Sequence, residues 1–175
     1  MVRALSLTAG AALLLLGACQ PSTKPQPLTA ADSTAVTNIA TQYAAAWNKG
    51  DVDGVVSLYA SDALVLLPDT APLQGSNAVR TYLNTALGTP RRPVLALAPA
   101  TPVGRQDLAM VAGTFTLTLP PDTTPARGRA AAAPPPPLAG HSLVVLMKGA
   151  DGNWKITNHA VSYDAPKPAA AQKGR

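Results

Sequence analysis

The sequence predicts an α+β fold in which three N-terminal helices pack on a curved antiparallel sheet. Two observations support this prediction. Apolar residues recur at helical three-to-four spacing before Gly88, and after it they alternate with polar residues. The expected elements therefore run helix, helix, strand, helix and then four strands. Helices packed on one face of such a sheet give a cone-shaped domain with its core between the two layers.

Capping residues delimit the expected helices. Thr29 and Asp32 match the capping-box pattern of a helix start, and Gly50 provides a stop for the same helix. Asp51 is expected to cap a short second helix, and a third is expected over residues 76–88. The inward positions are predicted to be Val36, Ile39, Tyr43 and Trp47, then Val52, Val55, Val56 and Tyr59, then Val79, Tyr82, Leu83 and Leu87.

Short apolar runs and period-two alternation indicate the strands. Before residue 119, apolar side chains alternate with Thr114, Thr116 and Thr118. This pattern places the apolar side on the core and directs the threonines toward solvent or a partner. The stretch "GADGN" is a turn signal between the last two strands. The expected strands cover residues 63–68, 94–98, 108–119, 141–148 and 154–163.

Two segments are expected to lack regular structure. Seven prolines lie in residues 120–139, and proline is excluded from helix interiors and central strands. We interpret this segment as a disordered insertion that lengthens a hairpin loop. The tail over residues 165–175 is rich in Pro, Ala and Lys and is also expected to be disordered. The folded domain is accordingly predicted to cover residues 29–164.

The N-terminus has the layout of a secretory signal peptide. Arg3 supplies a positive charge, an uncharged apolar run follows, and small residues precede Cys19. The run is shorter than the roughly 20 residues of a membrane-spanning helix. A lone cysteine can also be a core residue or a free thiol, but "LGAC" resembles the lipobox of bacterial lipoproteins. That resemblance implies a signal peptide over residues 1–18, acylation of Cys19 and a tether over residues 19–28.

These features predict a protein of the bacterial cell envelope, lipid-anchored to a membrane through Cys19 and facing the periplasm. Gln20 stands where an inner-membrane retention signal has aspartate, which favours the outer membrane. The net charge of +5 is spread thinly. Arg91 and Arg92 form the one adjacent basic pair, without interleaved aromatic residues, so no nucleic acid partner is expected.

The chain offers few residues for acid–base or metal chemistry. It contains no glutamate, nine aspartates and two histidines, His141 and His159. Neither an HExxH nor a CxxC pattern occurs in it. We therefore expect no metal site and no cofactor.

The stretches "QYAAAWNKGDVDGVVSLYASDALVLLP" and "LQGSNAVRTYL" resemble the opening of the nuclear-transport-factor-2-like superfamily, and more narrowly its SnoaL-like branch. The later "DGNWKITNHAVS" resembles the closing strand of that branch. The likeness covers about residues 32–163 apart from the Pro-rich insertion. It implies a conical pocket between the helices and the concave sheet. Members use this pocket for isomerisation, cyclisation, hydrolysis, dehydration or simple binding, so the fold alone does not define the function.

Ketosteroid isomerases provide the sharpest comparison within the superfamily. Tyr43 matches the position of their oxyanion donor on the first helix. Their general base precedes the proline that ends the first strand, where this chain has Leu67. Their second acid lies in a late strand that reads "SLVVLM" here. Isomerase chemistry of that kind is therefore disfavoured, and whether the domain is an enzyme stays open.

Three further polar residues are candidates for the pocket. His159 resembles a histidine in the closing strand of SnoaL-like domains. Counting from Trp154 and Ile156, strict alternation places it on the face opposite the core, unless a bulge reverses the order. His141 begins a strand and is a candidate for the pocket rim. Asp69 follows the first strand and is expected to be a turn residue.

The sequence thus predicts a SnoaL-like domain that binds a small apolar or amphipathic ligand. One alternative is an enzyme of the lyase, isomerase or hydrolase type that uses Tyr43 with His159 or Asp69. Another is a dimerisation or docking module, and a homodimer through the threonine-bearing face is expected. The predicted ligand pocket consists of Tyr43, Trp47, Leu67, Phe115, Trp154 and His159.

Overall fold

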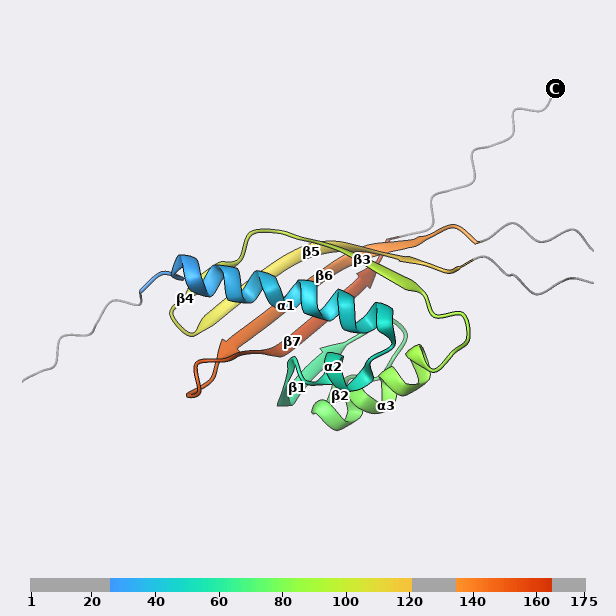
Figure 1. Ribbon diagram of the computed structural model, residues 1–175, viewed down its shortest axis with the longest axis horizontal. Helices are drawn as coiled ribbons and strands as arrows, with labels where there is room; N and C mark the ends of the chain where they lie inside the picture. Colours follow the sequence, from blue (N-terminus) through green and yellow to red (C-terminus); the bar gives the residue numbers. More distant parts are fainter. Residues whose placement is uncertain (1–25, 121–134, 165–175) are drawn as a thin grey trace, which may run out of the picture.

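The computed structural model describes residues 26–120 and 135–164 (Figure 1). The predicted signal peptide, Cys19, most of the tether, the centre of the Pro-rich insertion and the tail lie outside these residues. Within them, no helix is both long enough and apolar enough to cross a membrane.

Three helices form in the described part of the chain: α1 (Ala30–Lys49), α2 (Val52–Val56) and α3 (Ser76–Leu87). The side chain of Thr29 accepts a hydrogen bond from the Asp32 backbone and caps α1. Gly50 ends α1 in the left-handed conformation, at a φ of 73°, which glycine adopts without a steric penalty. Asp51 accepts from the Gly54 backbone and caps α2.

The sheet is open and curved, and α1 lies across its concave face while α2 and α3 lie beside β1 and β2 (Figure 1). Its strand order is β2-β1-β7-β6-β5-β3, with β4 paired to β5. The strands are β1 (Tyr59–Leu66), β2 (Leu73–Gln74), β3 (Val94–Pro99), β4 (Val103–Arg105), β5 (Leu108–Thr118), β6 (Leu138–Lys148) and β7 (Trp154–Tyr163).

The expectation of a purely antiparallel sheet is wrong at one place, because β1 pairs with β7 in parallel. The two strands are nearly 100 residues apart in the chain, and no local pattern encodes the direction of that pairing. The other strand pairs are antiparallel.

Three element boundaries also differ from those predicted from the sequence. Tyr59, expected on the inner face of the second helix, begins β1 instead because α2 already ends at Val56. Leu138 begins β6 inside the segment expected to be a loop. At the end of the expected tether, Pro27 forms a bridge with Arg105, and Leu28 packs against the core.

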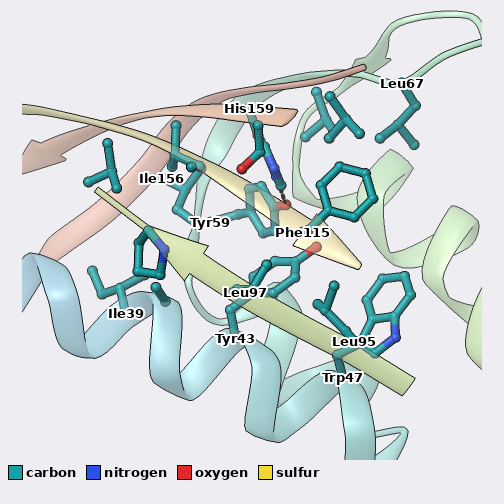
Figure 2. Close-up of a pocket in the computed structure, with 18 of the residues that line it drawn as sticks. Ile39, Tyr43, Trp47, Tyr59, Leu67, Leu95, Leu97, Phe115, Ile156 and His159 are labelled. Atoms are coloured by element: carbon teal, nitrogen blue, oxygen red, sulfur yellow. Dashed lines mark hydrogen bonds between the residues drawn. The ribbon is translucent and has the colours of Figure 1, made fainter. Parts of the chain in front are cut away.

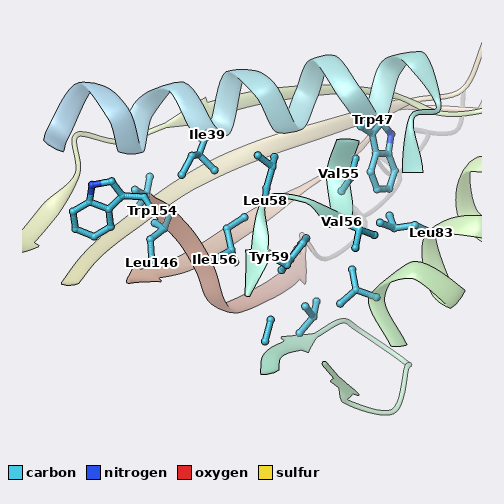
Figure 3. Close-up of a cluster of buried hydrophobic side chains, with 14 of the residues drawn as sticks. Ile39, Trp47, Val55, Val56, Leu58, Tyr59, Leu83, Leu146, Trp154 and Ile156 are labelled. Carbon is cyan, nitrogen blue, oxygen red and sulfur yellow. The ribbon is translucent and has the colours of Figure 1, made fainter. Parts of the chain in front are cut away.

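The core lies between the helices and the concave face of the sheet. Figure 3 shows Ile39 of α1 above Leu146 and Ile156 of the sheet. A second part of the same cluster joins α2 and α3 through side chains such as Val55 and Leu83, which are 0% and 2% exposed. Burial of this apolar surface fixes the helices on the sheet.

Candidate functional site

A cavity of about 130 Å³ lies between α1 and the concave face of the sheet. Side chains from α1, α3 and six strands line it (Figure 2), and most of them are aliphatic or aromatic. Among the residues that the structure describes, no aspartate, lysine or arginine lines this cavity. The site is therefore apolar and uncharged, apart from a small number of neutral polar groups.

A β-bulge directs His159 into the cavity. Across the β6–β7 ladder, Val145 pairs with Asn158 and Leu146 pairs with Ile156, so Thr157 has no partner strand residue. The Thr157 hydroxyl instead donates to the carbonyl of Val145 at 3.3 Å. The extra residue reverses the alternation that would have turned His159 away from the core.

His159 and Tyr59 are joined by a hydrogen bond. The Tyr59 hydroxyl lies 2.8 Å from Nδ1 of the imidazole, and the two rings stack with centroids 6.2 Å apart (Figure 2). Desolvation lowers the pKa of His159 to about 4, so the ring is neutral at pH 7. In one tautomer Tyr59 donates and Nε2 carries the proton. In the other, Nδ1 donates and Nε2 is an acceptor.

Tyr43 of α1 extends this pair into a chain of three polar groups. Its ring meets those of Tyr59 and His159 edge-on, with centroid distances of 6.3 and 5.9 Å. Desolvation raises the pKa of Tyr43 to about 12, and a hydrogen bond from the Tyr59 hydroxyl partly offsets that rise. Burial likewise raises the pKa of Tyr59 well above its ordinary value. All three groups are therefore uncharged, and we call them the polar chain.

The opposite walls of the cavity are held by contacts between α1 and β3. Trp47 stacks on Tyr43 with ring centroids 6.2 Å apart, and its Nε1 donates to the carbonyl of Pro93 at 3.0 Å. Asn48 donates from Nδ2 to the carbonyl of Leu95 at 2.9 Å, and its Oδ1 accepts from the backbone of the same residue at 2.8 Å. These three hydrogen bonds fix the distance between helix and strand.

Five of the six predicted pocket residues line the cavity: Tyr43, Trp47, Leu67, Phe115 and His159. Phe115 lies close against Gly140, where an added Cβ would come within 2.7 Å of the ring. Leu67 is partly buried just after β1. The polar position nearest to it in the sequence, Asp69, is exposed in a turn at a φ of 52° and does not line the cavity.

Trp154 does not line the cavity, which corrects the sixth assignment. It faces the concave side as alternation predicts, but it lies near the start of α1, where its Nε1 donates to Asp32 at 3.2 Å. Asp32 also receives a hydrogen bond from Thr29 at 2.7 Å and pairs with Lys148 at 2.7 Å. We call these four residues the polar latch.

The latch is a fully partnered polar cluster. The hydrogen bond from Lys148, followed by that from Thr29, lowers the pKa of Asp32 to about 2. The Lys148 ammonium also lies 6.0 Å from the centroid of the Trp154 ring. Every buried side-chain oxygen and nitrogen of the cluster has a hydrogen-bond partner.

His141 lies away from the cavity. Its side chain is exposed on β6 and Nε2 is 3.3 Å from the carboxylate of Asp164. The described residues contain no group of three or more His, Cys, Asp or Glu side chains placed to hold a metal ion. Sequence reasoning missed Tyr59 as a polar group of the site, and no local pattern could have identified it, because its partner is 100 residues away.

A protein-family model described as a SnoaL-like domain matches residues 40–159. Among solved structures, a ketosteroid isomerase-like protein from Erwinia carotovora atroseptica matches with 20% identity and a TM-score of 0.64, covering 79% of this chain and all of its own. A protein of unknown function with a cystatin-like fold from Nostoc punctiforme matches with 20% identity and a TM-score of 0.63, over 81% of this chain and 97% of its own. An NTF2-like protein from Novosphingobium aromaticivorans matches with 12% identity and a TM-score of 0.61, over 79% of this chain and 85% of its own. No curated protein sequence matches the chain.

Proposed function

The chain belongs to the SnoaL-like domain family, and from that premise we propose that it binds a small apolar molecule in the cavity under α1. The observation that carries the proposal is the polar chain of Tyr43, Tyr59 and His159 in a cavity lined mostly by apolar side chains. Apolar walls supply affinity by removing ligand surface from water, and a few polar groups orient the ligand.

The hydrogen bond between Tyr59 and His159 can run in either of two directions. If the Tyr59 hydroxyl donates to Nδ1, the imidazole carries its proton on Nε2. If Nδ1 donates, the hydroxyl proton of Tyr59 is free for another acceptor. In both directions, these two residues and Tyr43 supply neutral donors for a carbonyl, ether or hydroxyl oxygen.

Native mass spectrometry of the purified protein tests this proposal. We expect a co-purified small molecule that is released on denaturation. Tyr43→Phe should weaken binding of an oxygen-bearing ligand by about 0.5–1.5 kcal/mol, the contribution of one neutral hydrogen bond. Thr37→Ala is the control, because it removes an exposed hydroxyl of the same helix that does not line the cavity. A protein that carries no ligand and binds no apolar probe would contradict the proposal.

We further propose that the domain acts at the bacterial envelope, with Cys19 acylated. The "LGAC" sequence after an apolar run supports this. Two acyl chains would anchor the protein stably, since each buried CH₂ contributes about 0.8 kcal/mol. The wild-type protein should partition into a detergent phase and carry acyl mass on Cys19, whereas Cys19→Ser should do neither. An unmodified wild-type protein in the aqueous phase would rule out the anchor.

An enzyme is the second candidate, favoured by the hydrogen bond between Tyr59 and His159. A neutral imidazole that can accept a proton at one nitrogen while releasing one at the other could move a proton within a bound ketone. Leu67 and the apolar residues of β6 leave no carboxylate base beside it. We expect no measurable isomerisation of a Δ5-ketosteroid. Turnover that disappears in both Tyr43→Phe and His159→Gln would establish the enzyme instead.

We also propose a homodimer through the convex face of the sheet. Besides the threonines of β5, this face exposes Met110, Leu143 and Met147, which are 43%, 42% and 48% exposed. Exposed apolar side chains on adjacent strands are typical of an interface. Sedimentation at increasing concentration should show a dimer, and Leu143→Asp should shift the protein toward monomer. A monomer at every concentration would contradict the proposal.

A further inference from the structure

We infer that the ligand is an uncharged molecule about the size of one six-membered ring, with a single oxygen that meets the polar chain at one side of the cavity. This inference rests on the proposed binding function and specifies the chemical class of its ligand. A monocyclic ketone or aldehyde fits the description, whereas a steroid or a carboxylate does not.

The volume of the cavity limits the size of the ligand. The cavity holds about 130 Å³. An engineered apolar cavity of about 150 Å³ binds benzene. A single ring with a short substituent therefore fills the space, and a molecule of several fused rings exceeds it.

The walls oppose expansion of the cavity. The side chain of Trp47 is held by its hydrogen bond to Pro93, and Asn48 joins α1 to Leu95 of β3 through two hydrogen bonds. At another wall, the ring of Phe115 lies against the backbone at Gly140, where even a Cβ would be too close. A larger ligand would have to break these contacts or push the Phe115 ring away.

The residues that line the cavity indicate that the ligand is uncharged. No aspartate, lysine or arginine among the described residues lines the cavity. Outside the lining, Asp32 is paired with Lys148 and Asp53 with Arg80. Moving a carboxylate or an ammonium group into such a site without a partner is far costlier than moving a neutral group.

The placement of the polar groups sets the position of the oxygen. Tyr43, Tyr59 and His159 come from α1, β1 and β7 and are turned toward one another (Figure 2). Leu95, Leu97 and Phe115 face them across the cavity and offer no hydrogen bond. A ring with an oxygen at one end can accept a hydrogen bond from the polar chain while its apolar atoms pack against the leucines and Phe115.

A matched series of probes tests the inference by calorimetry on the full chain with Cys19→Ser, which needs no detergent. Acetophenone is the expected ligand, benzoate is its charged counterpart, and α-methylstyrene has the same shape without the oxygen. Acetophenone should saturate one site per chain. Benzoate should bind at least about tenfold more weakly. The hydrocarbon should bind about twofold to tenfold more weakly than the ketone, and Tyr43→Phe should reduce that difference.

The size limit is tested with 2-acetonaphthone and with a steroid ketone. Neither should displace acetophenone from the protein, but Leu97→Ala should admit the naphthyl ketone because it removes part of one wall. Val94→Ala is the control, since that side chain is 51% exposed on the same strand. Tight binding of benzoate or of the steroid ketone would overturn the inference while leaving the proposed function intact. Binding of none of the probes, the hydrocarbon included, would overturn both.

Discussion

Helix α1 meets the sheet through the polar latch at its start and through the cavity from Val36 to Trp47. At the latch, Asp32 has three side-chain partners, Thr29, Lys148 and Trp154. At the cavity, Tyr43 points its hydroxyl toward open space and toward Tyr59. Both regions bring polar groups together under one helix, but the latch is an ion pair with its hydrogen bonds, whereas the groups at the cavity are neutral and line open space.

This difference separates stability from binding along one element. A buried polar group that has all its hydrogen-bond partners stabilises the folded state. Removing one partner leaves a buried donor or acceptor unsatisfied, which lowers the free energy of unfolding. A polar group that meets a cavity contributes little to folding and is available to a ligand. We therefore expect substitutions at the latch to change stability and conservative substitutions in the polar chain to change binding.

The largest expected effect is at the latch. Trp154 is 6% exposed, and Trp154→Ala removes a large buried ring together with the hydrogen bond to Asp32. The free energy of unfolding should fall by about 3–5 kcal/mol. Urea denaturation measures this change, with Leu66→Ala as the control, since that side chain is 44% exposed on the neighbouring strand β1. A loss below about 1 kcal/mol would show that the latch does not hold α1 in place.

The effect of intermediate size is on the pH dependence of stability, which should differ between the cavity and the polar latch. The unfolded chain binds a proton at His159 near pH 6.5, but burial lowers the pKa of the folded ring to about 4 and keeps it neutral above that pH. Stability should therefore fall as the pH drops from 6.5 toward 4. Asp32 acts at lower pH, because its pKa is lowered from 3.8 to about 2 by Lys148 and Thr29. Its contribution is present above pH 3.8 and is lost as the pH falls toward 2.

Urea midpoints measured across this range should resolve the two steps. His159→Gln should remove the upper step, and Asp32→Asn should remove the lower one. A bound ligand should raise stability at every pH at which it binds, without removing the lower step, since Asp32 does not line the cavity. One undivided loss of stability in all three proteins would contradict the separation.

The smallest expected effect is that of Tyr43→Phe on folding. The hydroxyl is removed from a partly buried ring whose contacts with Trp47, Tyr59 and His159 are retained. We expect the free energy of unfolding to change by less than about 0.5 kcal/mol. Thermal unfolding without ligand measures it. A loss comparable to that of Trp154→Ala would mean that the hydroxyl is structural.

Local chemistry explains which parts of the fold were predictable. The bonds that cap α1 and α2 span three or four residues, so Thr29, Gly50 and Asp51 are readable in the sequence. β2 and β4 have two and three residues, too few to show a period. The parallel pairing of β1 with β7 depends on packing between segments nearly 100 residues apart, which no short window contains.

The site was predictable in part, for related reasons. The helical spacing that brings Tyr43 and Trp47 to one face is a local property, and both line the cavity. Alternation placed Trp154 correctly on the concave face, but the cavity covers only part of that face. The position of His159 depends on the bulge at Thr157, and the residues around it contain no turn or glycine signal for it.

The bulge makes strand length a determinant of what the cavity contains. Inward and outward side chains alternate along β7, and the extra residue at Thr157 shifts this alternation by one position. Loss of Thr157 would remove the bulge but leave Asn158 outward and His159 inward, because plain alternation from Ile156 then gives the same placement. Insertion of one further residue would shift the alternation again and turn His159, Val161 and Tyr163 away from the cavity together. A lineage built on this fold can thus lose the imidazole from its cavity by insertion as well as by substitution.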